Sequence, residues 1–135
     1  MTAENGVVTL RSTHDFPETC RRLEVLIRTR GLTVFADLDF QRDASRHALT
    51  MSPVRLFVFG NPSSGTPLML EKATSGLDLP LKVLVHQDGT GGVWLSYNSP
   101  QYIISRHGLP DRLLKNIAGI EGLVNKAAGP EALLG

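Results

Sequence analysis

The loop between residues 59 and 69 carries the most suggestive chemistry of the sequence. Gly60 and Gly65 are separated by four residues, and a helix is predicted to begin at Thr66, with Pro67 in its first turn. Free backbone N–H groups at such a helix start favour an anion. Nucleotide hydrolysis is not predicted, because the lysine of a phosphate-binding loop is absent. Two alternatives remain: a weaker anion or carboxylate site, or a structural turn in which the glycines permit unusual backbone angles.

Two polar residues of the following strands are expected near this loop. Lys82 and Asn98 are predicted to converge with it on one rim of a sheet, forming a polar pocket. Structural roles compete with this interpretation, since Asn98 fits a turn and Lys82 the exposed side of a strand. The candidate ligand-binding residues are therefore Gly60, Asn61, Gly65, Thr66, Lys82 and Asn98.

The titratable side chains give no clear catalytic or metal site. The four histidines lie far apart in sequence without an i, i+4 pair, so no metal or cofactor is predicted, and each is expected on the surface or in a loop: His14, His47, His86 and His107. An enzyme acting on a small metabolite would need His47 or His86 to meet Asp39 in the fold. Cys20 lies on an apolar helical stripe and is expected in the core.

Period and turn signals predict the elements that position these residues. Asp15 and Glu18 form a capping-box-like start for a helix over residues 16–30, and Asp39 is expected to cap a short helix through Ala48. A glycine-rich turn at residues 88–92 predicts an antiparallel hairpin. Strands are expected near 7–10, 32–38, 55–59, 81–86 and 93–97, and further helices at 66–73, 99–108 and 111–128.

This order of elements favours an α+β fold over a doubly wound parallel sheet. We expect a single domain over residues 1–135, with a twisted, mainly antiparallel sheet and two longer helices packed on one face. The four apolar positions predicted to line one face of the last helix are Leu113, Ile117, Ile120 and Val124.

Composition excludes several classes of protein. The formal net charge is +1, from 14 Lys and Arg against 13 Asp and Glu, so nucleic acid is not an expected partner. No apolar run approaches the roughly 20 residues needed to cross a bilayer. A single cysteine and no visible secretory signal favour the cytoplasm.

Three short motifs carry a family resemblance: Phe59-Gly60-Asn61-Pro62, Gly65-Thr66 and Asp78-Leu79-Pro80. With them the chain resembles the bacterial domain of unknown function 302 family, most clearly over Val34 to Leu109. A family-like core is expected at about residues 7–109, followed by a C-terminal helix at about 111–128. The resemblance implies a TATA-binding-protein-like architecture, often a symmetric dimer, without an assigned activity.

The chain departs from the family pattern at three positions. Phe40 stands where relatives usually have His, Ala48 where they usually have Gly, and Val54 where they usually have Thr. A role of that histidine would therefore be lost or altered here. The hypothesis from sequence is a non-catalytic small-ligand-binding or accessory protein, cytoplasmic and homodimeric, that takes an anionic or polar ligand. The alternatives are the enzyme described above and an interaction subunit of a larger complex.

Overall fold

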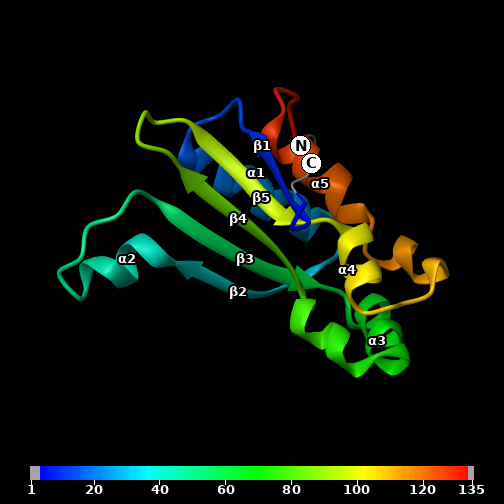
Figure 1. Cartoon of the computed structure of the whole chain (residues 1–135). Helices are drawn as coiled ribbons and strands as arrows, with labels where there is room; N and C mark the ends of the chain where they lie inside the picture. Colours follow the sequence, from blue (N-terminus) through cyan, green and yellow to red (C-terminus); the bar gives the residue numbers. More distant parts are fainter. Residues whose placement is uncertain (1–3, 134–135) are drawn as a thin grey trace.

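The computed structural model describes residues 4–133 and contains one five-stranded antiparallel sheet (Figure 1). The strand order is β1-β5-β4-β3-β2, so the first and last strands of the chain, β1 and β5, pair with each other. The strands are β1 (Val7–Arg11), β2 (Thr33–Asp39), β3 (Val54–Gly60), β4 (Leu81–Gln87) and β5 (Val93–Asn98).

Helices α1 (Phe16–Thr29) and α5 (Gly119–Ala128) pack against each other and against one face of this sheet. The predicted α+β class, with an antiparallel sheet and helices on one face, is confirmed. The remaining elements are α2 (Phe40–Ser45), α3 (Pro62–Glu71), α4 (Pro100–Arg106) and the 3₁₀ helices η1 (Ala73–Asp78) and η2 (Asp111–Asn116). Figure 1 shows α3 and α4 together at one end of the sheet.

Helix α1 begins where its capping signal predicted. The Asp15 carboxylate accepts a hydrogen bond from the Glu18 N–H at 2.9 Å, which satisfies one of the helix's free donors. Apolar side chains then recur every three or four residues and face the sheet, among them Leu23 and Ile27, both fully buried.

The buried apolar side chains form two clusters. The main core lies between the sheet and helices α1 and α5, and it includes Leu23, Ile27, Phe57, Phe59, Val83, Val85, Leu95, Leu123 and Val124. The satellite cluster lies among α3, α4 and η2, and it consists of Leu68, Ile103, Ile104, Leu109, Leu113 and Ile117.

The second sheet face is not covered by α1 and α5. Side chains alternate between the faces of a strand, so the neighbours of buried Phe57 and Val83 point away from the main core. One row of paired residues crosses the whole sheet on this second face, in the order Leu38, Leu56, Leu84, Ser96 and Thr9. Leu38 is 40% exposed.

The structure corrects the predicted start of α3. The helix begins at Pro62, not at Thr66, because Asn61 acts as its cap and accepts from the Ser63 N–H at 3.0 Å. Pro62 already supplies the preferred proline of a first turn. Pro67 therefore lies inside the helix.

The predicted helix over residues 111–128 is divided into η2 and α5, and the two clusters explain why. Leu113 and Ile117 pack in the satellite cluster, whereas Ile120 and Val124 pack in the main core. One straight helix would direct all four side chains to the same side, so the chain turns between them.

Helix α2 also ends earlier than predicted, at Ser45. Ala48 has φ +60° and so lies in the left-handed region, which no α-helix continues through. This conformation accounts for the glycine that the family pattern usually has at this position.

Candidate functional site

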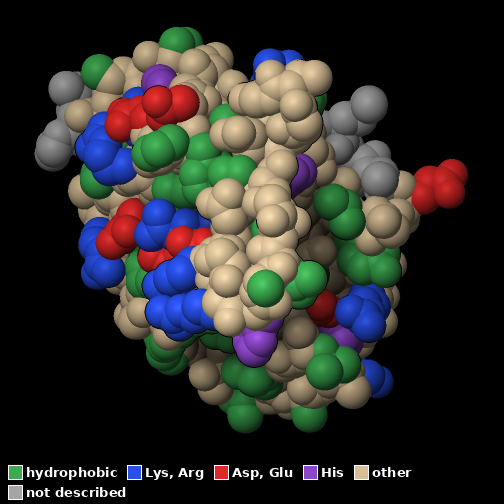
Figure 2. Space-filling model, turned by 90° about the vertical axis from the view of Figure 1, so that its left-hand side faces the viewer, with side chains coloured by type: hydrophobic (Ala, Val, Ile, Leu, Met, Phe, Trp, Pro, Cys, Tyr) green, Lys and Arg blue, Asp and Glu red, His purple; other side chains and the backbone are tan. Residues whose placement is uncertain are grey.

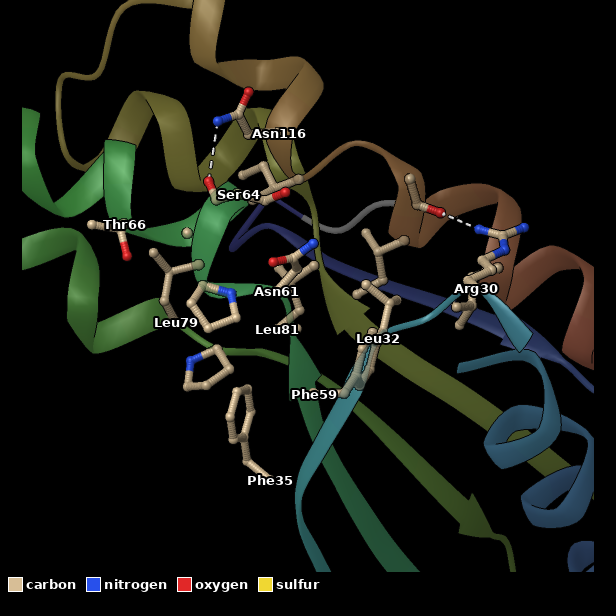
Figure 3. Close-up of a pocket in the computed structure, with 18 of the residues that line it drawn as sticks. Arg30, Leu32, Phe35, Phe59, Asn61, Ser64, Thr66, Leu79, Leu81 and Asn116 are labelled. Carbon is tan, nitrogen blue, oxygen red and sulfur yellow. Dashed lines mark hydrogen bonds between the residues drawn. The ribbon is translucent and has the colours of Figure 1, made fainter. Parts of the chain in front are cut away.

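A cavity of about 550 Å³ lies where the main core meets the satellite cluster (Figure 3). Its walls come from α3, from the ends of β2, β3 and β4, and from the segment joining η2 to α5. Most of the lining is apolar, namely Leu32, Phe35, Phe59, Pro62, Met69, Leu79, Pro80, Leu81, Ile117, Ile120 and Leu123. This size and lining are typical of small-molecule sites, which occupy roughly 300–1,000 Å³.

The lining also has three glycines and five polar side chains, the latter being Arg30, Asn61, Ser64, Thr66 and Asn116. The Asn116 amide donates to the Ser64 carbonyl oxygen at 3.1 Å and so holds η2 against α3. Arg30 Nη1 donates to the Gly119 carbonyl oxygen, also at 3.1 Å. Among the residues that line the cavity in the described part of the chain, Arg30 is the only charged one.

The structure brings four of the six predicted ligand-binding residues to this cavity. Gly60, Asn61, Gly65 and Thr66 all line it. Neither glycine has a positive φ, so the alternative in which they permit unusual backbone angles is wrong. Binding by these residues stays a prediction, and the apolar lining changes the kind of ligand expected.

Lys82 and Asn98 lie elsewhere. Lys82 follows Leu81, which lines the cavity, and alternation along β4 directs it to the other sheet face. Its ammonium group donates to the Pro80 carbonyl oxygen at 3.0 Å, and burial lowers its pKa. Asn98 is the last residue of β5, at the same end of the β4–β5 ladder as Lys82. No polar pocket of all six residues forms in the described structure.

The groups proposed for an enzyme have other partners. His86 Nε2 lies 2.8 Å from Ser96 Oγ, and burial lowers the pKa of this imidazole. The Asp39 carboxylate caps α2 by accepting from the Arg42 N–H at 2.9 Å. Within residues 4–133, no hydrogen bond or ion pair joins Asp39 to His86 or His47.

His107 is not the surface or loop residue that the sequence suggested. It is 6% exposed, its Nε2 lies 2.6 Å from Asp78 Oδ2, and its Nδ1 lies 3.1 Å from Thr74 Oγ1. Arg106 also bonds to Asp78. These contacts tie η1 to the end of α4, and the only sequence signal for them was Asp78 in a family motif.

A second unpredicted polar group is Arg22. It is 3% exposed and donates to three carbonyl oxygens at the end of α5, those of Lys126, Ala127 and Gly129. Arg22 directly precedes Leu23 of the apolar stripe of α1, and nothing in the sequence indicated these carbonyl partners. The prediction of Cys20 in the core agrees with its burial, which raises the pKa of its thiol to about 11.

Within the described residues, no group of three or more His, Cys, Asp or Glu side chains could hold a metal ion. Cations and anions are interspersed on the side shown in Figure 2. A large positive patch, which would favour a polyanion, is not seen on that side. An example of such pairing is Arg55 with Asp37, at 2.6 Å. From residue 4 to residue 133, no helix combines the length and apolar character that a membrane span requires.

The sheet, its helical layer and the cavity at its edge define a small α+β protein with a pre-formed pocket. The chain belongs to the family described as "Domain of unknown function DUF302", whose model matches residues 8–127. The fold is similar to the crystal structure of an uncharacterized conserved protein DUF302 from Bacillus stearothermophilus. The TM-score is 0.75 at 20% identity, with 91% of this chain and 95% of that chain covered.

Two curated relatives are each 38% identical over 128 residues, which is 93% of this chain. They are named "Fluoride-specific ion channel FluC 1" and come from Brucella suis biovar 1 (strain 1330) and Brucella abortus biovar 1 (strain 9-941). The match covers 50% of the first protein and 47% of the second. This chain therefore spans about half the length of the curated relatives it matches.

Proposed function

We propose that this chain is a non-catalytic domain that binds a small, largely apolar molecule in the cavity beside α3. The observation that carries the proposal is the cavity itself, about 550 Å³ at the junction of the two hydrophobic clusters. A space of this size among apolar side chains favours an apolar occupant, because burying apolar surface there removes it from water. The ligand expected from sequence, anionic or polar, is thus replaced by one with an apolar body.

Nile red, a neutral apolar dye, tests this proposal. Its fluorescence rises in apolar surroundings, so the full chain should bind it with a saturable signal. The Gly65→Leu variant should lose most of that signal, because a Cβ at Gly65 would lie 3.9 Å from Leu79 Cδ1 and the longer side chain occupies the cavity.

Gly89→Leu is the matched control. Gly89 lies in the β4–β5 turn, its φ is not positive, and nothing lies within 4 Å of an added Cβ. It should bind Nile red as the original chain does. Equal binding by all three proteins would place the dye outside the cavity and would contradict the proposal. Native mass spectrometry of the gently purified chain would show directly whether a molecule is retained.

We further propose that the domain has an accessory role. The support is its match to about half of proteins named as fluoride-specific ion channels, which leaves an equally long part unmatched. In the Brucella suis relative, deleting the half similar to this chain should alter fluoride efflux without abolishing it. Complete loss of efflux despite normal membrane levels would contradict an accessory role. We propose a cytoplasmic location for the residues of this chain, in keeping with its single buried thiol.

A homodimer is also proposed, with the second copy on the uncovered sheet face. The leucine row of that face, Leu38, Leu56 and Leu84, supports this arrangement because it exposes apolar surface that a copy of the chain would cover. Light scattering should give twice the chain mass, and Leu84→Glu should give a monomer. A monomer for the original chain would remove this proposal.

A further inference from the structure

The lining of the cavity has one feature that its apolar character does not explain, a single cation. Arg30 is the residue that caps the C-terminal end of α1, and its side chain extends to the start of α5. Figure 3 shows the guanidinium at one end of the pocket, with Thr66 and Phe35 at the far side. Within the described chain it donates to the Gly119 carbonyl oxygen and pairs with no carboxylate.

A guanidinium offers five N–H donors in a planar fork that matches the two oxygens of a carboxylate. One hydrogen bond to Gly119 leaves most of this capacity for a ligand. The other polar lining groups, including Asn61 and Asn116, are neutral, and no acidic side chain lines the cavity in the described structure. A ligand carrying one negative charge would therefore meet one positive charge and no repulsion.

We propose that the cavity takes an amphipathic monocarboxylate, with an apolar body among Phe59, Leu81 and Ile120 and its carboxylate on Arg30. This inference rests on the proposed binding function and adds the chemical class of the ligand. Charge-assisted, bidentate contacts of this kind are roughly twice as strong as neutral hydrogen bonds. The apolar body supplies affinity, and Arg30 selects the ionised end.

Decanoate and 1-decanol provide a matched pair of probes, since they share an alkyl chain and differ in the charged group. Isothermal titration of the full chain should show decanoate binding about 10-fold more tightly than 1-decanol. Arg30→Gln should weaken decanoate binding by about 10-fold and leave 1-decanol unchanged. Arg30→Lys keeps the charge but not the planar fork, so its affinity for decanoate should lie between those of the original chain and Arg30→Gln.

Arg28→Gln is the matched control, because it removes the same charge from the same end of α1. Arg28 is exposed and pairs with Glu24 at 3.1 Å, and it does not line the cavity. This variant should bind decanoate as the original chain does. An equal loss in Arg28→Gln and Arg30→Gln would show a general charge effect and would overturn the assignment.

The outcomes separate this inference from the function on which it rests. If both probes bind equally, or if Arg30→Gln binds decanoate normally, carboxylate recognition is overturned while cavity binding stands. If decanoate does not bind at all, the inference fails, and the Nile red experiment decides the proposed function independently. Circular dichroism of Arg30→Gln and Arg30→Lys shows whether each variant is folded before its affinity is compared.

Discussion

Two arginines, one within α1 and one at its C-terminal cap, reach opposite ends of α5 and lie in very different surroundings. Arg22 is buried at the C-terminal end of α5, where its guanidinium donates to three carbonyl oxygens. Arg30 is exposed at the N-terminal end, where it donates to one carbonyl oxygen and lines the cavity. Arginine thus has two roles about two helical turns apart. At the C-terminal end of α5 its hydrogen bonds to the chain close the structure, and at the N-terminal end of α5 the cavity stays open beside it.

The difference teaches how to separate a structural charge from one that can serve a ligand. Arg22 meets the carbonyl end of α5, which the helix dipole makes favourable for a cation, and its partners are all within the chain. Arg30 meets the opposite end, where the dipole favours an anion, and most of its donors remain for another molecule. Removing Arg22 should therefore destabilise the folded protein, whereas removing Arg30 should change what it binds.

The largest expected effect is that of Arg22→Ala, which should lower the free energy of unfolding by about 3 kcal/mol. The substitution leaves the carbonyl oxygens of Lys126, Ala127 and Gly129 without their charged donor at the contact between α1 and α5. Urea unfolding followed by circular dichroism measures the loss. Arg30→Ala should cost less than about 1 kcal/mol in the same experiment, because its one contact is exposed. Similar losses in the two variants would break the comparison.

The next effect concerns the satellite side of the cavity. His107→Ala should lower the free energy of unfolding by about 2 kcal/mol, because it removes a buried ring and the 2.6 Å contact with Asp78, which keeps only its bond to the exposed Arg106. Thr74→Val removes only the partner of Nδ1 and should cost about 1 kcal/mol or less. A loss in His107→Ala no greater than in Thr74→Val would show that the Asp78 contact contributes little to the satellite side.

Local signals in the sequence predicted much of the fold. The Asp15 cap, the glycine-rich hairpin turn and the alternation in the strands each depend on residues close together in the chain. The predicted start of α3 was wrong because two cap-and-proline pairs compete within seven residues. Asn61 with Pro62 comes first, and a helix already formed there has no further need of Thr66 as a cap.

The missed parts of the candidate site depend on contacts distant in sequence. Arg30 lies 89 residues from Gly119, and His107 lies 29 residues from Asp78. A single sequence contains no local pattern for such pairs. Likewise, the single apolar helix face predicted after Pro110 was wrong, because its four side chains are buried but belong to two clusters that only the tertiary structure shows.

A third variant fills the cavity from the side of α3. Gly65→Leu should raise the free energy of unfolding by about 1 kcal/mol, since leucine is the better helix former within α3 and fills the cavity. Gly89→Leu, in a turn, should bring no such gain. Thermal unfolding of both variants measures the difference. If Gly65→Leu is the less stable protein, the cavity has no room for the side chain. The contrast between the closed C-terminal end of α5 and the open cavity at its N-terminal end then loses its basis.

The smallest expected effect concerns residue 48, which has neither a buried charge nor a cavity beside it. It serves as a reference for the larger effects at the two arginines. Ala48 has φ +60°, a conformation that costs an ordinary residue about 1 kcal/mol or more. Ala48→Gly should relieve this strain but add freedom to the unfolded chain, for a net gain of about 0.5 kcal/mol in urea unfolding. Ala44→Gly, inside α2, should instead lose about 1 kcal/mol because no strain is relieved there. Equal losses at the two positions would show that residue 48 does not adopt the left-handed conformation in solution, and that its usual glycine has another cause.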